Sequence, residues 1–280
     1  MKIEFCGVRG SIPSPGPGTS KFGGNTSCIH VTLNDGRHLI FDAGTGIRVL
    51  GDRLEEEKAN PIYVLLTHHH WDHIQGFPFF SPIYRPEQSF FVCCTLSDSH
   101  KRLCSLMEQM DGTHFPVIFT ELPSNGECIV QNIPGFCRDN GFDVELNPIN
   151  HPGGGTAYKL REDGFTFAYV TDNELEPPGT PLVSYDEWVE FCRGADVLVH
   201  DSQYVEGDMP HKHGWGHSLV SQVRQLALDA EVGRLVLSHH DPDRSDSELE
   251  AIQAECEQFF KSKRSDTKVL CAWEGLELGS

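Results

Sequence analysis

The sequence has few positive charges for its length. Its 280 residues contain 22 Lys+Arg against 41 Asp+Glu, a formal net charge of −19. A protein that binds a nucleic-acid backbone by neutralising phosphates needs a basic face. The charge therefore argues against long nucleic acids and anionic membranes as partners. A small anion could still enter a pocket in which metal ions gather.

Long apolar runs and paired cysteines are also absent. No run of about 18 apolar residues is present, and the start, MKIEFCGVRG, lacks the apolar segment of a secretion signal. We therefore expect a cytoplasmic protein with no membrane span. None of the ten cysteines forms a Cys-x-x-Cys pair, and a reducing compartment favours free buried thiols over disulfides or a thiolate zinc site.

The apolar pattern predicts one layered α/β domain over residues 1–280, because no linker, repeat or low-complexity tract interrupts it. Early strands precede alternating helices and strands, with a loop-rich stretch from about 111 to 140. Strands are expected near 2–8, 27–33, 37–42, 62–66, 89–94, 142–149, 156–161, 165–171, 196–200, 233–238 and 267–272. Helices are expected near 46–57, 97–110, 184–193, 217–230 and 244–262.

The most informative segment is a histidine cluster that follows the apolar strand 62–66. It has the pattern His-x-His-x-Asp-His, in which His68 and His70 can reach one ion and Asp72 and His73 a second. Ligands are commonly placed after strand ends in α/β folds. Imidazole and carboxylate together suit zinc, manganese or iron. The segment therefore predicts part of a metal site.

One loop cannot complete two metal sites, so further ligands are expected at other strand ends. His151, Asp172 and His239 each follow an apolar stretch. His240 is adjacent to His239, and the residues alone support either as a ligand.

These motifs together resemble the metallo-β-lactamase-fold hydrolases over nearly the whole chain. The resemblance implies a four-layer αββα sandwich with two divalent metal ions, zinc first and manganese or iron as alternatives, at one edge between the sheets. Asp42 matches an aspartate that supports the histidine loop without binding metal. The position after Ser238 matches the family ligand, which favours His239 over His240. The implied ligands are His68, His70 and His151 for the first ion, Asp72, His73 and His239 for the second, and Asp172 as the bridge.

A branch of this family suggests the chemistry. Two such ions lower the pKa of a water between them, which gives a metal-bridged hydroxide that Asp72 can orient. Gly216-His217-Ser218 resembles a segment of the tRNase Z-like and cyclic-nucleotide phosphodiesterase branch, where the histidine assists the leaving oxygen. Alternatively, Ser218 caps a helix and His217 is exposed. Asp201 or His200 could pair with His217 as a proton relay, or both could be buried polar support.

The spacing of the motifs limits which class of substrate is expected. tRNase Z carries a tRNA-binding arm between its third histidine motif and its bridging aspartate. Here only 21 residues (172 − 151) separate His151 from Asp172, and two predicted strands fill them. We therefore predict a binuclear phosphodiesterase acting on a small phosphodiester, with a cyclic nucleotide or related cyclic phosphate as first choice. The alternatives are a tRNase Z-like RNA 3′-end endonuclease and a thioesterase or redox member of the same fold.

Three further features stay open at this point. Arg9 could meet a substrate phosphate or form a structural salt bridge. The stretches 77–80 and 115–117 could form an aromatic wall for a base, although core packing is the favoured reading. A homodimer is possible, because similar phosphodiesterases are often dimers.

Overall fold

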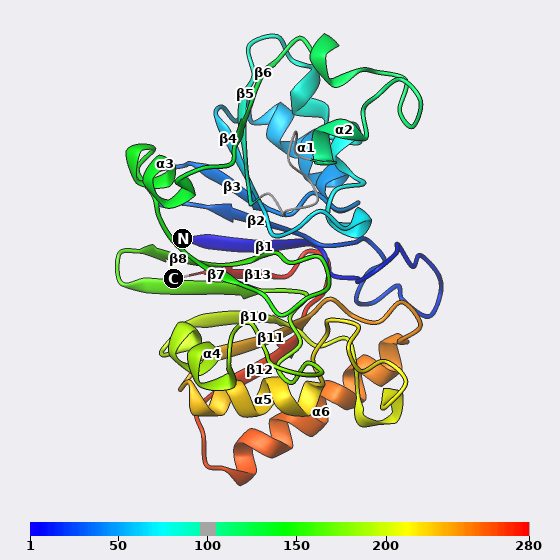
Figure 1. Ribbon diagram of the computed structural model, residues 1–280, viewed down its shortest axis with the longest axis vertical. Helices are drawn as coiled ribbons and strands as arrows, with labels where there is room; N and C mark the ends of the chain where they lie inside the picture. Colours follow the sequence, from blue (N-terminus) through cyan, green and yellow to red (C-terminus); the bar gives the residue numbers. More distant parts are fainter. Residues whose placement is uncertain (96–104, 280) are drawn as a thin grey trace.

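The computed structural model describes residues 1–95 and 105–279, which form two β-sheets packed face to face (Figure 1). Within these residues the first sheet has the strand order β13-β1-β2-β3-β4-β5-β6. Strands β3 to β6 run parallel, and β13, β1, β2 and β3 pair antiparallel. The strands are β1 (Lys2–Gly7), β2 (Cys28–Thr32), β3 (His38–Phe41), β4 (Ile62–Leu66), β5 (Ser89–Cys94), β6 (Asn125–Ile129) and β13 (Glu277–Gly279).

The second sheet has the order β12-β11-β10-β9-β8-β7. Strands β9 to β12 run parallel, whereas β7, β8 and β9 form an antiparallel meander. The strands are β7 (Asp143–Pro148), β8 (Thr156–Glu162), β9 (Phe165–Val170), β10 (Val197–Asp201), β11 (Arg234–Ser238) and β12 (Lys268–Cys271).

Helices cover the outer faces of both sheets. Figure 1 shows α1 (Ile47–Glu56) and α2 (Ser105–Glu108) beside the first sheet, and α4 (Tyr185–Cys192), α5 (Val220–Asp229) and α6 (Asp246–Ser262) beside the second. The short α3 (Ile133–Asp139) packs on β7. This arrangement confirms the predicted αββα sandwich. None of the helices in the described ranges has the length and apolar character that a membrane span requires.

The central core joins the two sheets and also anchors the loops at their ends. The Phe41 ring of β3 makes edge contacts with Tyr158, Phe167 and Tyr169 of the other sheet, with ring centroids 5.5–5.8 Å apart. Two of these rings keep a polar end, as buried tyrosines usually do. Tyr169 Oη donates to Asp42 Oδ2 (2.9 Å) and Tyr158 Oη to the carbonyl oxygen of Leu66 (2.8 Å). Core packing therefore fixes the positions where β3 and β4 end.

The structure corrects three sequence predictions. The stretch predicted to be loop-rich contains β6 and α3, because β6 is a half-exposed edge strand without apolar alternation and α3 has only seven residues. Strand β13 was not predicted. Helix α5 begins at Val220, not at 217, because Ser218 is tied by its hydroxyl to the carbonyl oxygen of Asn173. Of the helix predicted over 97–110, residues 97–104 lie outside the described residues.

A half-buried ion pair between β1 and α1 yields a prediction for stability. Arg53 Nη1 lies 2.6 Å from Glu4 Oε1, and His30 Nδ1 lies 3.8 Å from Glu4 Oε2. Burial by itself raises the pKa of Glu4, but the contacts with His30 and Arg53 outweigh it and lower the pKa from 4.5 to about 2. The folded state therefore binds this proton less readily than the unfolded state. The stabilisation is present above pH 4.5 and is lost as the pH falls towards 2.

We expect Glu4→Gln to lower the free energy of unfolding at pH 7 by about 2 kcal/mol. The difference from the parent protein should shrink below pH 4.5, as measured by urea unfolding at several pH values. Glu277→Gln, which removes an exposed ion pair with Lys2, is the control and should change stability by about 0.5 kcal/mol or less. A Glu4 effect that does not vary with pH would assign the loss to packing instead of charge.

Candidate metal centre

The candidate site lies where strands of both sheets end. Asp42 follows β3, the histidine loop follows β4, and Asp172 and His239 follow β9 and β11. The antiparallel meander directs β7 the same way as β9, so His151 reaches the same edge. Asp42, Asp172 and His239 have φ angles of 61°, 51° and 58°. This left-handed backbone conformation is unfavourable for residues other than glycine. Such residues are concentrated at functional sites.

The seven residues predicted as ligands come together in two groups that share Asp172. Within each group, the ligand-type atoms lie within 4.8 Å of one another. A third group, Asp201, His217 and His239, was not expected as a set of ligands. The first two groups are His68, His70, His151 and Asp172, and Asp72, His73, Asp172 and His239.

The donor atoms fit metal ions better than they fit one another. His68 Nε2 and His73 Nε2 point towards Asp172 at 3.6 and 3.1 Å, yet neither has hydrogen-bond geometry with any described residue. His70 Nδ1 and His151 Nε2 face each other at 3.0 Å. Burying such polar atoms unpaired is costly. Imidazole nitrogens and carboxylate oxygens around one point are the donor set for divalent transition metals.

Outer contacts orient the rings. His73 Nδ1 donates to Asp42 Oδ2 (2.8 Å), His239 Nδ1 to Gln203 Oε1 (2.8 Å) and His151 Nδ1 to the Gly216 carbonyl oxygen (2.9 Å). Each bond places the ring proton on Nδ1 and leaves the Nε2 lone pair for the site, as is usual for metal-binding histidines. Sequence analysis singled out Asp42 as support for the histidine loop but missed Gln203.

Electrostatics favour the metal-binding protonation state at three of the donors. His73 is the exception, because burial lowers the pKa of its ring but Asp172 and Asp72 outweigh burial and raise that pKa. Burial lowers the pKa of His151 to about 4, and burial together with nearby His73 lowers the pKa of His68 well below its usual value. Burial would raise the pKa of Asp172, but His239 and His73 reverse this and hold the pKa well below the usual range. Neutral imidazoles and an ionised carboxylate are what a divalent ion requires.

The side chain of the adjacent His240 points away from the ligand groups. Its Nε2 donates to the carbonyl oxygen of Ala272 (2.9 Å), and burial lowers its pKa to about 3. His240 belongs to none of the described ligand groups. The structure thus places His239, and not its neighbour, in the site.

The loop after β1 closes one side of the site. The Ser11 N–H donates to Asp72 Oδ2 (2.7 Å), and Gln203 Nε2 donates to Ser11 Oγ (3.3 Å). Gly10 has to be a glycine, because a Cβ there would lie 2.4 Å from the His239 ring. Arg9 is fully buried and donates to backbone carbonyl oxygens, including that of Arg244 (2.8 Å). It therefore supports this loop and does not reach a substrate phosphate.

His217 lies beside the second ligand group and is paired with Asp201. Its Nδ1 is 2.7 Å from Asp201 Oδ2, and its ring stacks on that of His239 with centroids 5.1 Å apart. Burial lowers the pKa of His217, but Asp201 outweighs it and raises the pKa to about 9. His200 instead donates to the backbone carbonyl oxygen of Asp201. Of the two candidate partners, Asp201 makes the contact.

The alternative in which His217 is exposed and Ser218 caps a helix is wrong. The His217 residue is only 8% exposed. The Ser218 hydroxyl donates to the carbonyl oxygen of Asn173, and helix α5 begins two residues later. The Gly-His-Ser segment therefore belongs to the site.

Glu174, which sequence analysis missed, holds this segment in place. Its carboxylate accepts the N–H groups of Gly214 (2.8 Å) and Gly216 (3.0 Å), and the Gly216 carbonyl accepts from His151. Gly216 has φ 89°, and a Cβ there would lie 2.0 Å from His151 Nδ1. The contacts join the loop that carries His217 to a predicted metal ligand.

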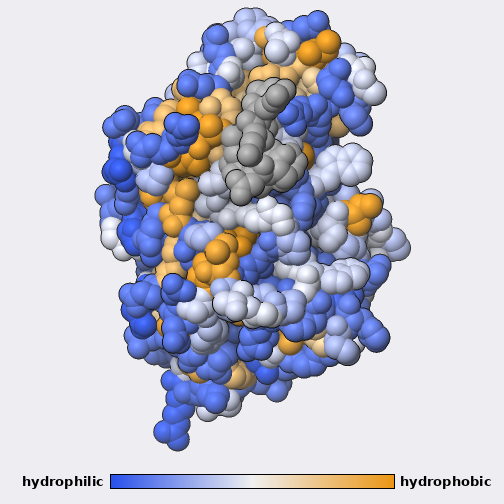
Figure 2. Space-filling model, in the orientation of Figure 1, coloured by the Kyte–Doolittle hydropathy of each residue, from blue (hydrophilic) through white to orange (hydrophobic). Residues whose placement is uncertain are grey.

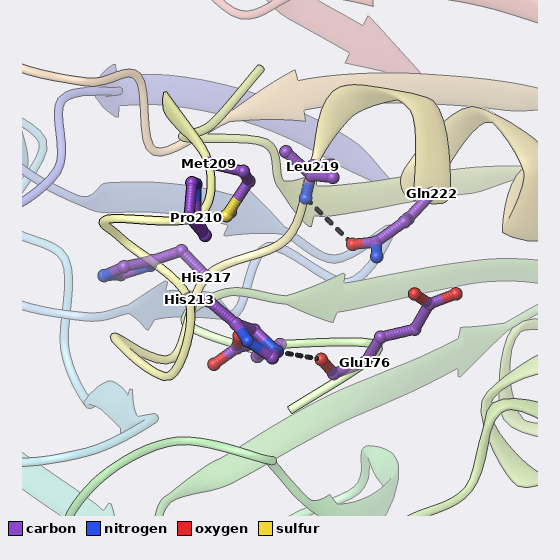
Figure 3. A pocket seen from close by; sticks show the side chains of 8 residues that line it. Glu176, Met209, Pro210, His213, His217, Leu219 and Gln222 are labelled. Carbon is purple, nitrogen blue, oxygen red and sulfur yellow. Dashed lines mark hydrogen bonds and ion pairs between the residues drawn. The ribbon is translucent and has the colours of Figure 1, made fainter. Parts of the chain in front are cut away.

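A small cavity opens onto His217. Its volume is about 220 Å³, and Figure 3 shows Met209, Pro210, His213 and Gln222 around it. The His213 ring donates to the carbonyl oxygen of Glu176 (3.0 Å). The cavity has the size for one small group beside the ring of His217.

Comparison with known proteins identifies the family. Residues 37–240 match the model of the β-lactamase superfamily domain. Ribonuclease Z from Streptococcus pneumoniae strain CGSP14 is 27% identical, with 85% of this chain and 89% of that protein covered. The chain belongs to the metallo-β-lactamase superfamily and is a metal-dependent hydrolase of that fold. Its two His/Asp groups are typical of the superfamily's binuclear metal site.

Solved structures share the fold at low sequence identity. The metallo-β-lactamase fold protein YhfI from Bacillus subtilis has a TM-score of 0.68 at 16% identity and covers 99% of this chain and 98% of its own. Human tRNase Z, short form, has a TM-score of 0.62 at 17% identity, with 100% and 99% covered. A diphosphatase from the PhnP family has a TM-score of 0.64 at 16% identity, with 100% and 97% covered.

Proposed function

We propose that the protein is a phosphodiesterase that hydrolyses a small phosphodiester, with a cyclic nucleotide or related cyclic phosphate as first choice. The main support for this proposal is the His217–Asp201 pair, which lies beside the two groups of ligand-type residues. An alkoxide leaving group needs a proton as the P–O bond breaks. A buried imidazole with a raised pKa, packed against His239, is suited to supply it.

The ligand groups suggest how two ions would be held. His68, His70 and His151 would hold one ion, Asp72, His73 and His239 the other, and Asp172 both. When bound, two divalent ions supply Lewis acidity that activates a water and stabilises negative charge on phosphoryl oxygens. Zinc is our first choice, and manganese or iron would also accept these donors.

The remaining steps fall to side chains of this protein. Asp72, held by the Ser11 N–H, would accept a hydrogen bond from the attacking water and orient it. His217 would donate the proton on Nε2 to the leaving oxygen, while Asp201 stabilises the imidazolium through Nδ1. The cations would lower the pKa of His217 from about 9 towards neutrality, where a general acid works best.

RNA processing is the second candidate, because curated relatives are named ribonuclease Z. Two observations favour a small substrate instead. The strands β8 and β9 occupy the segment between His151 and Asp172, leaving no tRNA-binding arm there. The net charge of −19 also opposes a polyanion.

A hydrolysis panel tests the proposal. The purified protein, loaded with zinc or manganese, is assayed on 3′,5′- and 2′,3′-cyclic nucleotides, bis(p-nitrophenyl) phosphate and precursor tRNA, with a chelator control. We expect chelator-sensitive opening of a cyclic nucleotide. Efficient cleavage of precursor tRNA alone would replace our proposal with the second candidate. Inactivity on every phosphodiester with both ions bound would point to an ester or thioester substrate.

A further inference from the structure

A second, larger cavity lies behind the histidine loop. Its volume is about 650 Å³, within the range of small-molecule sites. His70 has extended backbone (φ −65°, ψ 152°), so successive side chains point to opposite sides. His68 and His70 face the ligand groups, whereas His69 and Trp71 line the cavity. One short loop thus carries ligands on one side and a cavity wall on the other.

The cavity wall is aromatic and exposed to water. Trp71 is 71% exposed and Phe79 is 58% exposed, and Phe79 meets the half-buried Phe115 edge to face at 5.3 Å. Phe77 and Phe80, from the same segment, are fully buried in the core. The aromatic stretch predicted from the sequence therefore divides into core residues and cavity residues. Exposed aromatic side chains around a cavity indicate a binding surface.

The polar residues of the cavity limit what it can bind. Gln75, Gln109, Asp111 and His114 line it, and no Lys or Arg does so among the described residues. The Gln109 amide is fixed by donating to the carbonyl oxygens of Ile74 (2.7 Å) and Leu106 (2.9 Å). The Glu108 carboxylate and the amide oxygen of Gln109 can accept hydrogen bonds from the edge of a planar heterocycle, whereas the Asp111 carboxylate already accepts from Thr113 and His114. The acidic residues Glu108 and Asp111 in the described part of the lining disfavour a second phosphate.

We infer that this cavity binds the nucleobase of the substrate, with the base stacked on Trp71 and the phosphodiester at the metal centre. This inference rests on the proposed function and adds a binding site for the base, with Trp71 and Phe115 as specificity residues. A lipid chain would match this wall poorly, because amide and carboxylate groups lie among its aromatic rings.

Binding of adenosine, which carries no phosphate, tests the inference without turnover. Calorimetry is performed on the zinc-loaded protein and on Trp71→Ala, Trp71→Phe and Trp215→Ala. We expect Trp71→Ala to weaken adenosine binding roughly tenfold and Trp71→Phe to restore most of it, because stacking needs only an aromatic face. Trp215 is similarly exposed (60%) and does not line the cavity. Its variant should bind adenosine within about twofold of the parent.

Kinetics on a cyclic nucleotide give a second readout. Trp71→Ala and Phe115→Ala should raise KM roughly tenfold with little change in kcat, because they remove binding and not chemistry. Absence of adenosine binding, equal binding by Trp71→Ala, or preference for an alkyl phosphodiester would overturn the inference. The parent protein's activity on the panel tests the proposed function separately. Hydrolysis without any Trp71 effect would leave that function standing and reject the base site.

Discussion

Replacing His217 with alanine is expected to reduce kcat on a cyclic nucleotide by about 10²–10⁴-fold while the protein retains two metal ions. In the proposed mechanism the ring supplies a proton to the leaving oxygen, and it is not among the seven predicted ligands. Activity is measured on the metal-loaded variant, and metal content by elemental analysis after dialysis. Equal loss of activity and metal would instead make His217 a ligand, as its grouping with Asp201 and His239 allows.

Two controls separate proton donation from a structural role. Bis(p-nitrophenyl) phosphate has a leaving group that needs no proton, so His217→Ala should lose far less activity on it. Asp201→Asn keeps the shape but removes the charge that raises the pKa of His217. The rate falls as the pH rises through this pKa, because His217 must be protonated. Asp201→Asn should therefore move this decline to lower pH, whereas a structural defect would reduce the rate at every pH.

The sequence predicts the strand ends well because they combine two independent signals. An apolar run such as 62–66 predicts a buried strand, and a ligand-type residue just after it, such as His68, marks the end of that strand as a candidate site. Parallel strands then bring distant ends to one edge, which is why Asp172 and His239 meet the histidine loop. The resemblance to a known family added the pairing of ligands with ions.

The supporting contacts could not be predicted in this way. Gln203 and Glu174 are ordinary polar residues in loops, and only folding places them against His239 and Gly216. The left-handed backbone at Asp172 and His239 runs against local preference. The surroundings enforce it: both residues are buried, and His239 is held by Gln203. Local propensity is least informative at positions where tertiary contacts override it.

The residues that line the cavity behind the histidine loop also could not be predicted from the local sequence. Phe77 and Phe79 are two residues apart and equally apolar, yet one is in the core and the other faces water. The short helical turn Phe77–Phe79 turns their side chains to different sides. Three residues are too few for hydrophobic periodicity to show which of the two rings is buried. The sequence therefore favoured core packing for the whole stretch, which holds for Phe77 but not for Phe79.

Asp172 is shared by the two predicted metal sites, so its removal should have the largest effect on metal content. It is 2% exposed and belongs to both ligand groups. We expect Asp172→Ala to bind neither ion tightly. His151→Ala and His239→Ala should each lose about one, because each belongs to only one of the two predicted sites. Elemental analysis after dialysis against limiting chelator distinguishes these cases.

Metal removal should also lower thermal stability, since ions that bind only the folded state stabilise it by mass action. At a metal concentration of about one hundred times Kd the gain is about 2.7 kcal/mol, which corresponds to a Tm change of roughly 4–5 °C for a chain of this size. The chelated protein should melt lower by this amount, and Asp172→Ala should melt at one temperature with or without metal. If neither chelator nor added metal changes the Tm of the parent protein, the buried imidazoles and carboxylates satisfy one another's hydrogen bonds without metal. The two-ion centre would then be wrong.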